Sequence, residues 1–342
     1  MSISHVERVA AAALTISFLA GCAGASSTPA TATTFAQSSS HAAKKKPCPC
    51  LYVAQLNGNS ITVYPITAKK DAKPQQTLSG SGTGLSGPWD VAVDASGNMY
   101  VANQSNSVTI YAAGATGNAS PIGTISGSYT GLNDPQGIAL NPVTGDIYVA
   151  NTGGGASDDG TITVYAPGSY GNVAPIATIA GYSTGLSSPE GLVLDASGNI
   201  YVPNDGNHTI TVYAAGSNGD VAPTATISGS YTKLSNPYQL SLDSSNNIYV
   251  ANYAGASGIN VLEFAAGSNG NLAPIKTIAG TKTKLDGTDG IALDASGNEY
   301  AANYQGASIT VYQAGSNGNR KPIRFIKGSK TGINGPEGIT IR

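Results

Sequence analysis

Short segments in which apolar and polar residues alternate follow one another along the chain from Leu51 to Arg342. An alternation of period two is typical of β-strands that bury one face, and long amphipathic helical patterns are absent. Clusters of Gly, Asn, Asp and Ser separate the segments and favour tight turns. The 44 Gly and 18 Pro residues among 342 fit a chain with many turns. The pattern therefore predicts an all-β protein.

The segments recur in the same order with a period of about 50 residues. The element YVAN or a close variant begins at Tyr52, Tyr100, Tyr148, Tyr201, Tyr249 and Tyr300, with spacings of 48, 48, 53, 48 and 51 residues by subtraction. Each unit continues with a segment such as SVTIYAAG, a segment such as PIATIAG and, after a Pro-x-Gly loop, a segment such as GIALD. Four such strands describe one antiparallel blade of a β-propeller, whose faces are buried only when blades stack around an axis.

The number of repeats predicts the architecture. The repeat region starts on the second strand of a unit, LYVAQL, and ends after five complete cycles on an additional first strand, PEGITIR, Pro336 to Arg342. Pairing of this last strand with the opening unit would complete a ring of six four-stranded antiparallel blades and remove the open edge. We therefore expect a monomeric six-bladed propeller over residues 51–342.

The first 50 residues differ in composition from the repeats. Arg8 precedes the apolar run VAAALTISFLAG, which is too short to span a bilayer and is typical of a signal peptide. The run ends in LAGC, which resembles the lipobox of bacterial lipoproteins and implies cleavage before Cys22 and acylation of its thiol; an ordinary signal peptide is the alternative. We predict a signal peptide over residues 1–22, a disordered Ser/Thr/Ala/Lys-rich tether over 23–50, and an extracytoplasmic protein held at a membrane by a lipid anchor.

The repeat is similar to that of a known group of propellers. The pattern Pro-x-Gly-[IL]-x-[LV]-Asp, Gly-Asn-x-Tyr-Val-Ala-Asn and Ile-Thr-Val-Tyr resembles the NHL-type six-bladed propellers and their gluconolactonase and virginiamycin B lyase relatives. The resemblance covers nearly all of residues 51–342 and implies a fold that carries lactonases, lyases and binding scaffolds alike. One departure is that NHL repeats usually have Asp where this chain has the Asn of YVAN.

One position of the repeat varies while its neighbours hardly change. It directly precedes the Gly of the Pro-x-Gly motif, a Gly that Asp90 replaces in one unit, and in a propeller it lies at the mouth of the central channel. The residues at this position are Trp89, Gln136, Glu190, Tyr238, Asp289 and Glu337. Because the constant residues serve blade stacking, we predict that these six form a ligand-binding ring, here called the mouth ring.

The carboxylates of the mouth ring have more than one interpretation. Gluconolactonase-like propellers place cation ligands at such pre-Gly positions, so the resemblance implies Glu190, Asp289, Glu337 and Gln136 as ligands of Ca²⁺ or Mg²⁺. Such a cation could polarise a lactone or ester carbonyl. The family's usual Asn ligands are not reproduced, and a water-filled channel lined by solvated side chains is the other interpretation. By resemblance to virginiamycin B lyase, His208 is a candidate general base; the alternative is an exposed loop residue.

Other recurring polar residues are predicted to be structural. Asp94, Asp195 and Asp294 of the DASGN turns are expected to bond their own backbone, and the YVAN asparagines to cap turns. Seven aromatic residues are predicted to project toward the mouth face, where they either cover loop backbone or contact sugar rings or a peptide. They are Trp89, Tyr129, Tyr182, Tyr231, Tyr238, Tyr253 and Tyr304.

Charge changes this picture only slightly. The net charge is −2, 11% of the residues are charged, and no basic stripe with interleaved aromatics indicates a nucleic-acid partner. No Lys or Arg occurs between Lys73 and Lys233, a span with ten acidic residues, whereas ten basic and seven acidic residues follow from Lys233 onward. The main prediction is an anchored propeller that binds a glycan or protein at the mouth ring. The alternatives are a cation-dependent lactonase or lyase using Glu190, Asp289 and Glu337, and a structural envelope protein.

Overall fold

The computed structural model describes residues 49–155, 159–253 and 259–342. In these residues the chain forms six four-stranded antiparallel sheets, which confirms the prediction of an all-β six-bladed propeller. The predicted signal peptide, Cys22 and almost all of the predicted tether lie outside the described residues. Within the described part of the chain, no helix is long and apolar enough to cross a bilayer.

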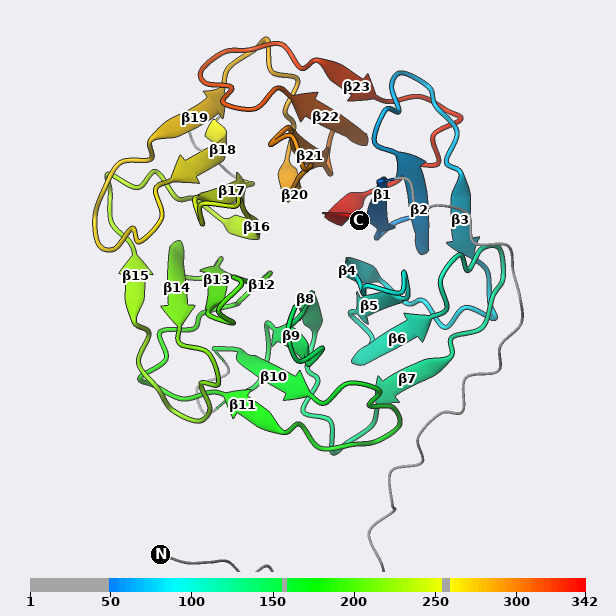
Figure 1. Ribbon diagram of the computed structural model, residues 1–342, viewed down its shortest axis with the longest axis vertical. Helices are drawn as coiled ribbons and strands as arrows, with labels where there is room; N and C mark the ends of the chain where they lie inside the picture. The colour runs from blue at the N-terminus through cyan, green and yellow to red at the C-terminus, as the bar shows by residue number, and fades with distance from the viewer. Residues whose placement is uncertain (1–48, 156–158, 254–258) are drawn as a thin grey trace, which may run out of the picture. The chain divides into compact units, whose positions relative to one another are not determined.

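The sheets are arranged as blades around a central channel, and one strand of each blade lies innermost (Figure 1). We number the blades 1 to 6 in chain order, so that blade 2 contains β4 to β7. The innermost strands are β24 (Pro336–Ile341), β4 (Pro88–Val93), β8 (Pro135–Leu140), β12 (Val193–Leu194), β16 (Pro237–Leu242) and β20 (Thr288–Leu293).

The two middle strands of each blade are the most buried, because neighbouring blades cover both of their faces. The second strands carry the YVAN element and are β1 (Cys50–Gln55), β5 (Met99–Asn103), β9 (Ile147–Asn151), β13 (Ile200–Asn204), β17 (Ile248–Asn252) and β21 (Glu299–Asn303). The third strands are β2 (Ser60–Pro65), β6 (Ser107–Tyr111), β10 (Thr161–Tyr165), β14 (Thr209–Tyr213), β18 (Ile259–Phe264) and β22 (Ser308–Tyr312).

The outermost strands are only three or four residues long. They are β3 (Gln76–Ser79), β7 (Gly123–Ser126), β11 (Ala177–Ile179), β15 (Ala225–Ile227), β19 (Lys276–Ala279) and β23 (Arg324–Ile326). A short edge strand offers few unpaired backbone groups to another chain, so the rim of the ring gives little opportunity for edge-to-edge association.

Blade 1 contains strands from both ends of the propeller. Its order is β24-β1-β2-β3, and β24 pairs antiparallel with β1, with Leu51 opposite Ile341 and Val53 opposite Ile339. In Figure 1 the red β24 lies beside the blue β1. The innermost strand of the first blade is therefore the last strand of the chain.

The hydrophobic core consists of six clusters, each between two neighbouring blades. Between blades 6 and 1, for example, Ile309 and Val311 pack with Leu51 and Val53. Because every blade shares its apolar residues with both neighbours, no blade buries a complete core by itself, and stability depends on the closed ring.

Polar contacts repeat at every junction between blades. The turn between the third and outer strands of each blade carries an Asn or Asp whose Oδ1 accepts a backbone N–H from the loop before that blade. The pairs, acceptor first, are Asn118 with Gly82, Asn172 with Tyr129, Asp220 with Ser183, Asn271 with Tyr231, Asn319 with Lys282 and Asp71 with Lys330, at 2.6 to 2.8 Å. The Asp71 contact joins blade 6 to blade 1, so the junction at the chain ends resembles the other five.

Candidate functional site at the channel mouth

A β-bulge in the innermost strand places each member of the mouth ring. In blade 2, Pro88 is opposite Asn103 and Asp90 is opposite Ala102, so Trp89 is one residue more than its partner strand provides. Blades 1, 3, 5 and 6 show the same one-residue shift at or beside the mouth-ring position. In blade 4 the offset lies between the isolated bridge Pro189–Asn204 and β12. A bulge redirects a side chain out of the regular alternation, which explains why this position is free to vary.

The six bulged residues converge on one cavity. All six members of the mouth ring line it, together with Asp90, Gly191, Gln239 and Gly338. Its free volume is about 10 Å³, which is close to the space needed by a single water-sized occupant. The structure therefore brings together the residues predicted from the sequence, around a space too small for a sugar ring.

Two carboxyl groups of the mouth ring, those of Asp289 and Glu337, interact directly with each other. Asp289 and Glu337 are hydrogen bonded to each other and are almost completely buried, with exposed fractions of 4% and 2%. Burial and the charge of Glu337 raise the pKa of Asp289 far above its ordinary value. At neutral pH the pair therefore keeps one proton, because two charges this close and this buried repel each other.

Glu190 is the third buried carboxyl of the mouth ring. Burial raises its pKa well above the ordinary value, and the charges of Asp205, Glu337 and Asp134 raise it further. No basic side chain lines the cavity. A cation or a hydrogen-bond donor that entered the cavity would stabilise the ionised carboxylates and would release protons on binding.

Four oxygen atoms of the mouth ring are buried without a hydrogen-bond partner. They are Gln136 Oε1, Glu190 Oε2, Asp289 Oδ1 and Glu337 Oε2. A buried polar atom without a partner is costly, by about 1–3 kcal/mol, and native proteins seldom leave one unexplained. All four are acceptor atoms, or become so on ionisation, so the occupant they fit is a donor of hydrogen bonds or a cation.

The donor chemistry of the mouth ring suits Ca²⁺ or Mg²⁺, but the arrangement does not. Among the residues the structure describes, no group of three or more His, Cys, Asp and Glu side chains is placed to hold a metal ion. Burial also raises the pKa of Asp289 and of Glu337, so the pair would have to lose a proton before both carboxylates could act as ligands.

Aromatic rings border the mouth on opposite sides of the ring. Trp89 of blade 2 and Tyr238 of blade 5 line the cavity and are half-buried. Tyr253 stacks on Tyr238, with ring centroids 5.1 Å apart and planes inclined by 15°, and its hydroxyl accepts from Gln305 Nε2 at 2.8 Å. These rings give the mouth a flat, partly apolar rim around its acidic centre.

Asp90 and Gln239 are site residues that the sequence prediction missed. They occupy, in blades 2 and 5, the position where the other four blades have Gly. Asp90 accepts from the backbone N–H of Val91 at 2.8 Å and of Ile138 at 3.2 Å, while Gln239 Oε1 accepts from that of Ile291 at 2.8 Å. Two polar residues in a Gly position of opposite blades were the signal that could have identified them.

The glycines at this position let the innermost strands approach each other. A Cβ on Gly137 would lie 2.6 Å from the Cα of Gly191, and one on Gly191 would lie 2.7 Å from the carbonyl oxygen of Tyr238. Gly is therefore required where the strands touch, and a side chain is accommodated where it extends across the axis, as in Asp90 and Gln239.

His208 does not line the mouth cavity. It has φ 56° in the turn between β13 and β14, and its Nδ1 accepts the backbone N–H of Asn236 at 3.1 Å. Asn59 and Asn106 have the same conformation in their blades and make the same contact to the next loop. The structure thus gives His208 a turn-stabilising role, and its action as a general base stays a prediction.

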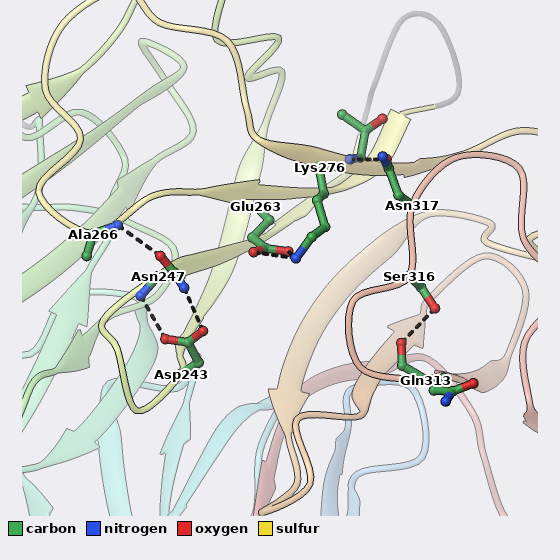
Figure 2. Close-up of polar contacts among 9 residues, drawn as sticks. Asp243, Asn247, Glu263, Ala266, Lys276, Gln313, Ser316 and Asn317 are labelled. Carbon is green, nitrogen blue, oxygen red and sulfur yellow. Dashed lines mark hydrogen bonds and ion pairs between the residues drawn. The ribbon is translucent and has the colours of Figure 1, made fainter.

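The structural interpretation of the turn residues is confirmed. Asp94 Oδ1 accepts from the backbone N–H of Ser96 and Asn98, and its Oδ2 accepts from Asn98 Nδ2. Asp195 and Asp294 make the corresponding bonds. Figure 2 shows the blade 5 version, in which Asn247 Oδ1 also accepts the backbone N–H of Ala266 at 3.1 Å.

The YVAN asparagines are completely buried and connect strands rather than bind a ligand. Asn103, for instance, donates through Nδ2 to Thr109 Oγ1 at 3.0 Å and accepts through Oδ1 the backbone N–H of Ser86 at 3.2 Å. The contact with Ser86 fixes the loop that leads into β4. The sequence had indicated only a role for Asn103 in the turn that follows its own strand.

The remaining predicted aromatics are not part of the mouth cavity. Tyr129, Tyr182 and Tyr231 lie in loops that follow outer strands and are highly exposed, by 72%, 78% and 67%. The hydroxyl of Tyr304 accepts from Asn57 Nδ2 at 3.3 Å. Of the seven predicted aromatics, the structure brings Trp89, Tyr238 and Tyr253 to the mouth.

Comparison with known proteins supports the fold and does not extend to function. No protein-family model and no curated protein matches the chain. Similar solved structures include a protein of unknown function from Bacteroides caccae, with TM-score 0.59 and 13% identity over 86% of this chain and 99% of that one. A functionally unknown protein from Desulfotomaculum acetoxidans has TM-score 0.56 and 12% identity over 85% and 98%. The WD40 β-propeller domain of Doa1 has TM-score 0.53 and 11% identity over 75% and 73%.

At these identities the likeness concerns the fold alone. The chain is a six-bladed β-propeller, an architecture that commonly serves as a binding module or scaffold.

Proposed function

We propose that this protein is an NHL-like, lipid-anchored extracytoplasmic binding module that takes a glycan or protein ligand over the channel mouth. The observation that carries the proposal is the convergence of all six mouth-ring residues on one cavity. These residues come from six different blades, and the fold uses a bulge in each blade to present them.

The size of the cavity indicates how such a ligand would sit. Only a water-sized group fits inside, so the ligand covers the mouth and inserts one hydroxyl, amide or ammonium group. That group would satisfy acceptors such as Glu190 Oε2 and Gln136 Oε1. The remainder of the ligand would lie against Trp89 and the stacked Tyr238–Tyr253 pair, where flat rings give contact area at low entropic cost.

The binding part of the proposal is tested on a glycan array and with an envelope-protein extract. We compare the wild-type chain, a Trp89→Ala/Tyr238→Ala variant and a Tyr129→Ala/Tyr182→Ala control that removes two exposed rings outside the mouth. We expect the mouth variant to lose binding at least tenfold and the control to retain it. Background signal from all three would leave only the scaffold interpretation.

The anchor is tested separately. Mass spectrometry of the protein from a bacterial membrane fraction should show a chain that begins at an acylated Cys22, and Cys22→Ser should release the protein from that fraction. An unmodified soluble chain would exclude the anchor and leave the binding proposal unaffected.

A cation-dependent lactonase or lyase is the second candidate. Four buried oxygen atoms without a hydrogen-bond partner favour this candidate. Against it, no group of three or more His, Cys, Asp and Glu side chains among the described residues is arranged to hold a metal ion. If a cation binds, Ca²⁺ should raise the melting temperature and a chelator should lower it, and Glu190→Gln/Asp289→Asn should abolish the shift. A Ca²⁺ shift that survives in this variant would end the candidate.

A further inference from the structure

Five exposed lysines gather where blade 6 meets blade 1; we call them the seam patch. They are Lys69, Lys70, Lys73, Lys327 and Lys330. The backbone holds them together, because Lys70 N donates to Phe325 O at 2.5 Å and Lys327 N donates to Lys70 O at 3.0 Å. In addition, Lys330 N donates to Asp71 Oδ1 at 2.7 Å.

Comparison with the other blades shows that the fold does not require these lysines. Lys70 has φ 57° in the turn between the third and outer strands, a conformation that strains any residue with a Cβ. In the other five blades the same position is Gly117, Gly171, Gly219, Gly270 and Gly318, all with positive φ. A lysine in a position suited to glycine costs stability, so the backbone geometry does not favour Lys70 here.

The neighbouring positions show the same substitution by lysine. Lys69 lies where the other blades have Thr116, Tyr170, Asn218, Asn269 and Asn317. Lys327 lies where they have Ser79, Ser126, Ala180, Ser228 and Ala279. Lysine is therefore found at these two positions in this junction alone, and the repeat does not require it there.

The charges of the seam patch are not used within the propeller. Among the described residues, the ion pair that forms is Lys276 with Glu263, and no lysine of the seam patch takes part in one. Asp71 is half-buried, and its Oδ1 accepts the backbone N–H of Lys330. The five ammonium groups are thus available to an external anion.

We propose that the seam patch binds the anionic lipid headgroups of the membrane to which the protein is attached. The described chain enters the propeller in blade 1, where β1 begins at Cys50, so residues 23–48 connect this same blade to Cys22. The covalent length of these residues is sufficient for one side of the ring to reach the bilayer. A basic surface close to an anchor is a common further contribution to membrane attachment, because anionic headgroups attract lysine side chains.

This inference does not involve the channel mouth or its ligand, and it uses only the anchor part of the proposed function. The test removes acylation, so that binding to vesicles reports on the folded surface. All proteins are full chains carrying Cys22→Ser. Co-sedimentation compares phosphatidylcholine vesicles with vesicles that contain one quarter phosphatidylglycerol.

The variants are designed from the repeat itself. Lys70→Gly/Lys327→Ser gives two seam positions the residues found in other blades, and the control Lys233→Gly/Lys282→Gly removes the same charge elsewhere. Since each lysine near an anionic surface contributes about a factor of five, the seam variant should bind anionic vesicles about 30-fold more weakly than the control.

Salt at about 0.5 M should abolish the difference, and phosphatidylcholine vesicles should bind neither variant. Equal vesicle binding by the seam variant and the control would overturn the proposal. So would a seam-dependent affinity for a DNA duplex without any affinity for anionic vesicles.

Discussion

Gln239 donates its side-chain amide to the carboxylate of Asp90 across the central channel, with Nε2 3.0 Å from Oδ1, although the residues are 149 positions apart. They come from β16 and β4, which lie on opposite sides of the ring (Figure 1). Of the residues that the structure describes, these two line both the small mouth cavity and a chamber of about 250 Å³ farther along the channel. This contact therefore forms a partition between the acidic mouth and the remainder of the channel.

Removal of the partition should destabilise the whole ring. Asp90→Ala leaves the backbone N–H groups of Val91 and Ile138 and the amide of Gln239 without an acceptor, and we expect a loss of about 2–4 kcal/mol in the free energy of unfolding. Asp90→Asn, which keeps one acceptor oxygen, should lose less. Urea denaturation measures both, and equal stability of Asp90→Ala and wild type would show that the partition is dispensable.

Stability should fall as the pH rises toward neutrality. Burial raises the pKa of Asp90 to about 7, that of Glu337 to about 7 and that of Glu299 to about 8. Because these pKa values are higher than in the unfolded chain, the folded state binds more protons between about pH 4 and pH 8, and the stabilisation is lost as the pH rises through this window. Calorimetry should give a higher melting temperature at pH 5 than at pH 8; the opposite order would contradict these assignments.

Glu299 lies between blades 5 and 6, where its burial should be unfavourable. Its Oε1 has no partner, and the nearby Glu263 is already paired with Lys276 at 2.8 Å (Figure 2). Blade 2 has Met99 at the equivalent position, so Glu299→Met should stabilise the protein by about 1–2 kcal/mol at pH 8 and weaken the pH dependence.

Glu263→Leu is the matched control for this substitution. It removes the partner of Lys276 and should destabilise. A destabilising effect of Glu299→Met would indicate that the buried carboxyl has a role in the fold.

Lys70→Gly should stabilise the protein even though it removes a charged side chain. The left-handed conformation costs lysine about 1–2 kcal/mol, and Gly avoids this strain. Part of the gain is offset because Gly has greater conformational entropy in the unfolded chain. The expected gain is about 0.5–1 kcal/mol in urea denaturation. Lys69→Asn, a change of charge without a change of conformation, should have almost no effect, and a similar gain from it would refute the strain argument.

Removal of the last strand should prevent cooperative folding. A chain that ends at Gly335 lacks β24, which covers Val53 and the edge of β1 and supplies Glu337 to the mouth ring. We expect non-cooperative thermal melting and exposed apolar surface by dye binding. A chain that lacks only Arg342 loses two backbone hydrogen bonds to Cys50 but keeps β24, so it should still melt cooperatively. Sharp melting of the shorter chain would show that closure by β24 is unnecessary.

The repeat made the fold and most of the candidate site predictable. If the blades form a ring, six residues at the same position of the repeat must lie around the axis. All six members of the mouth ring do line one cavity there. The single-occupant size of the cavity was not predictable, because it depends on how far Asp90 and Gln239 extend across the axis.

The roles of two further residues became clear only from the equivalent positions of other blades. His208 attracted attention as the only His of the repeats, but alignment with Asn59 and Asn106 identifies it as a turn residue. Nothing in the sequence pattern distinguished Lys70. The strain at Lys70 comes from its positive φ. It is recognised by comparison with the glycines that occupy the same position in the other five blades.

The bond between Asp71 and Lys330 also has a topological consequence. It gives the junction at the chain ends the same contact that joins every other pair of blades, so the ring has no mechanically distinct gap. A circularly permuted gene that links Arg342 to Cys50 and opens the chain at another exposed loop should therefore yield the same propeller, with its termini moved to the new site.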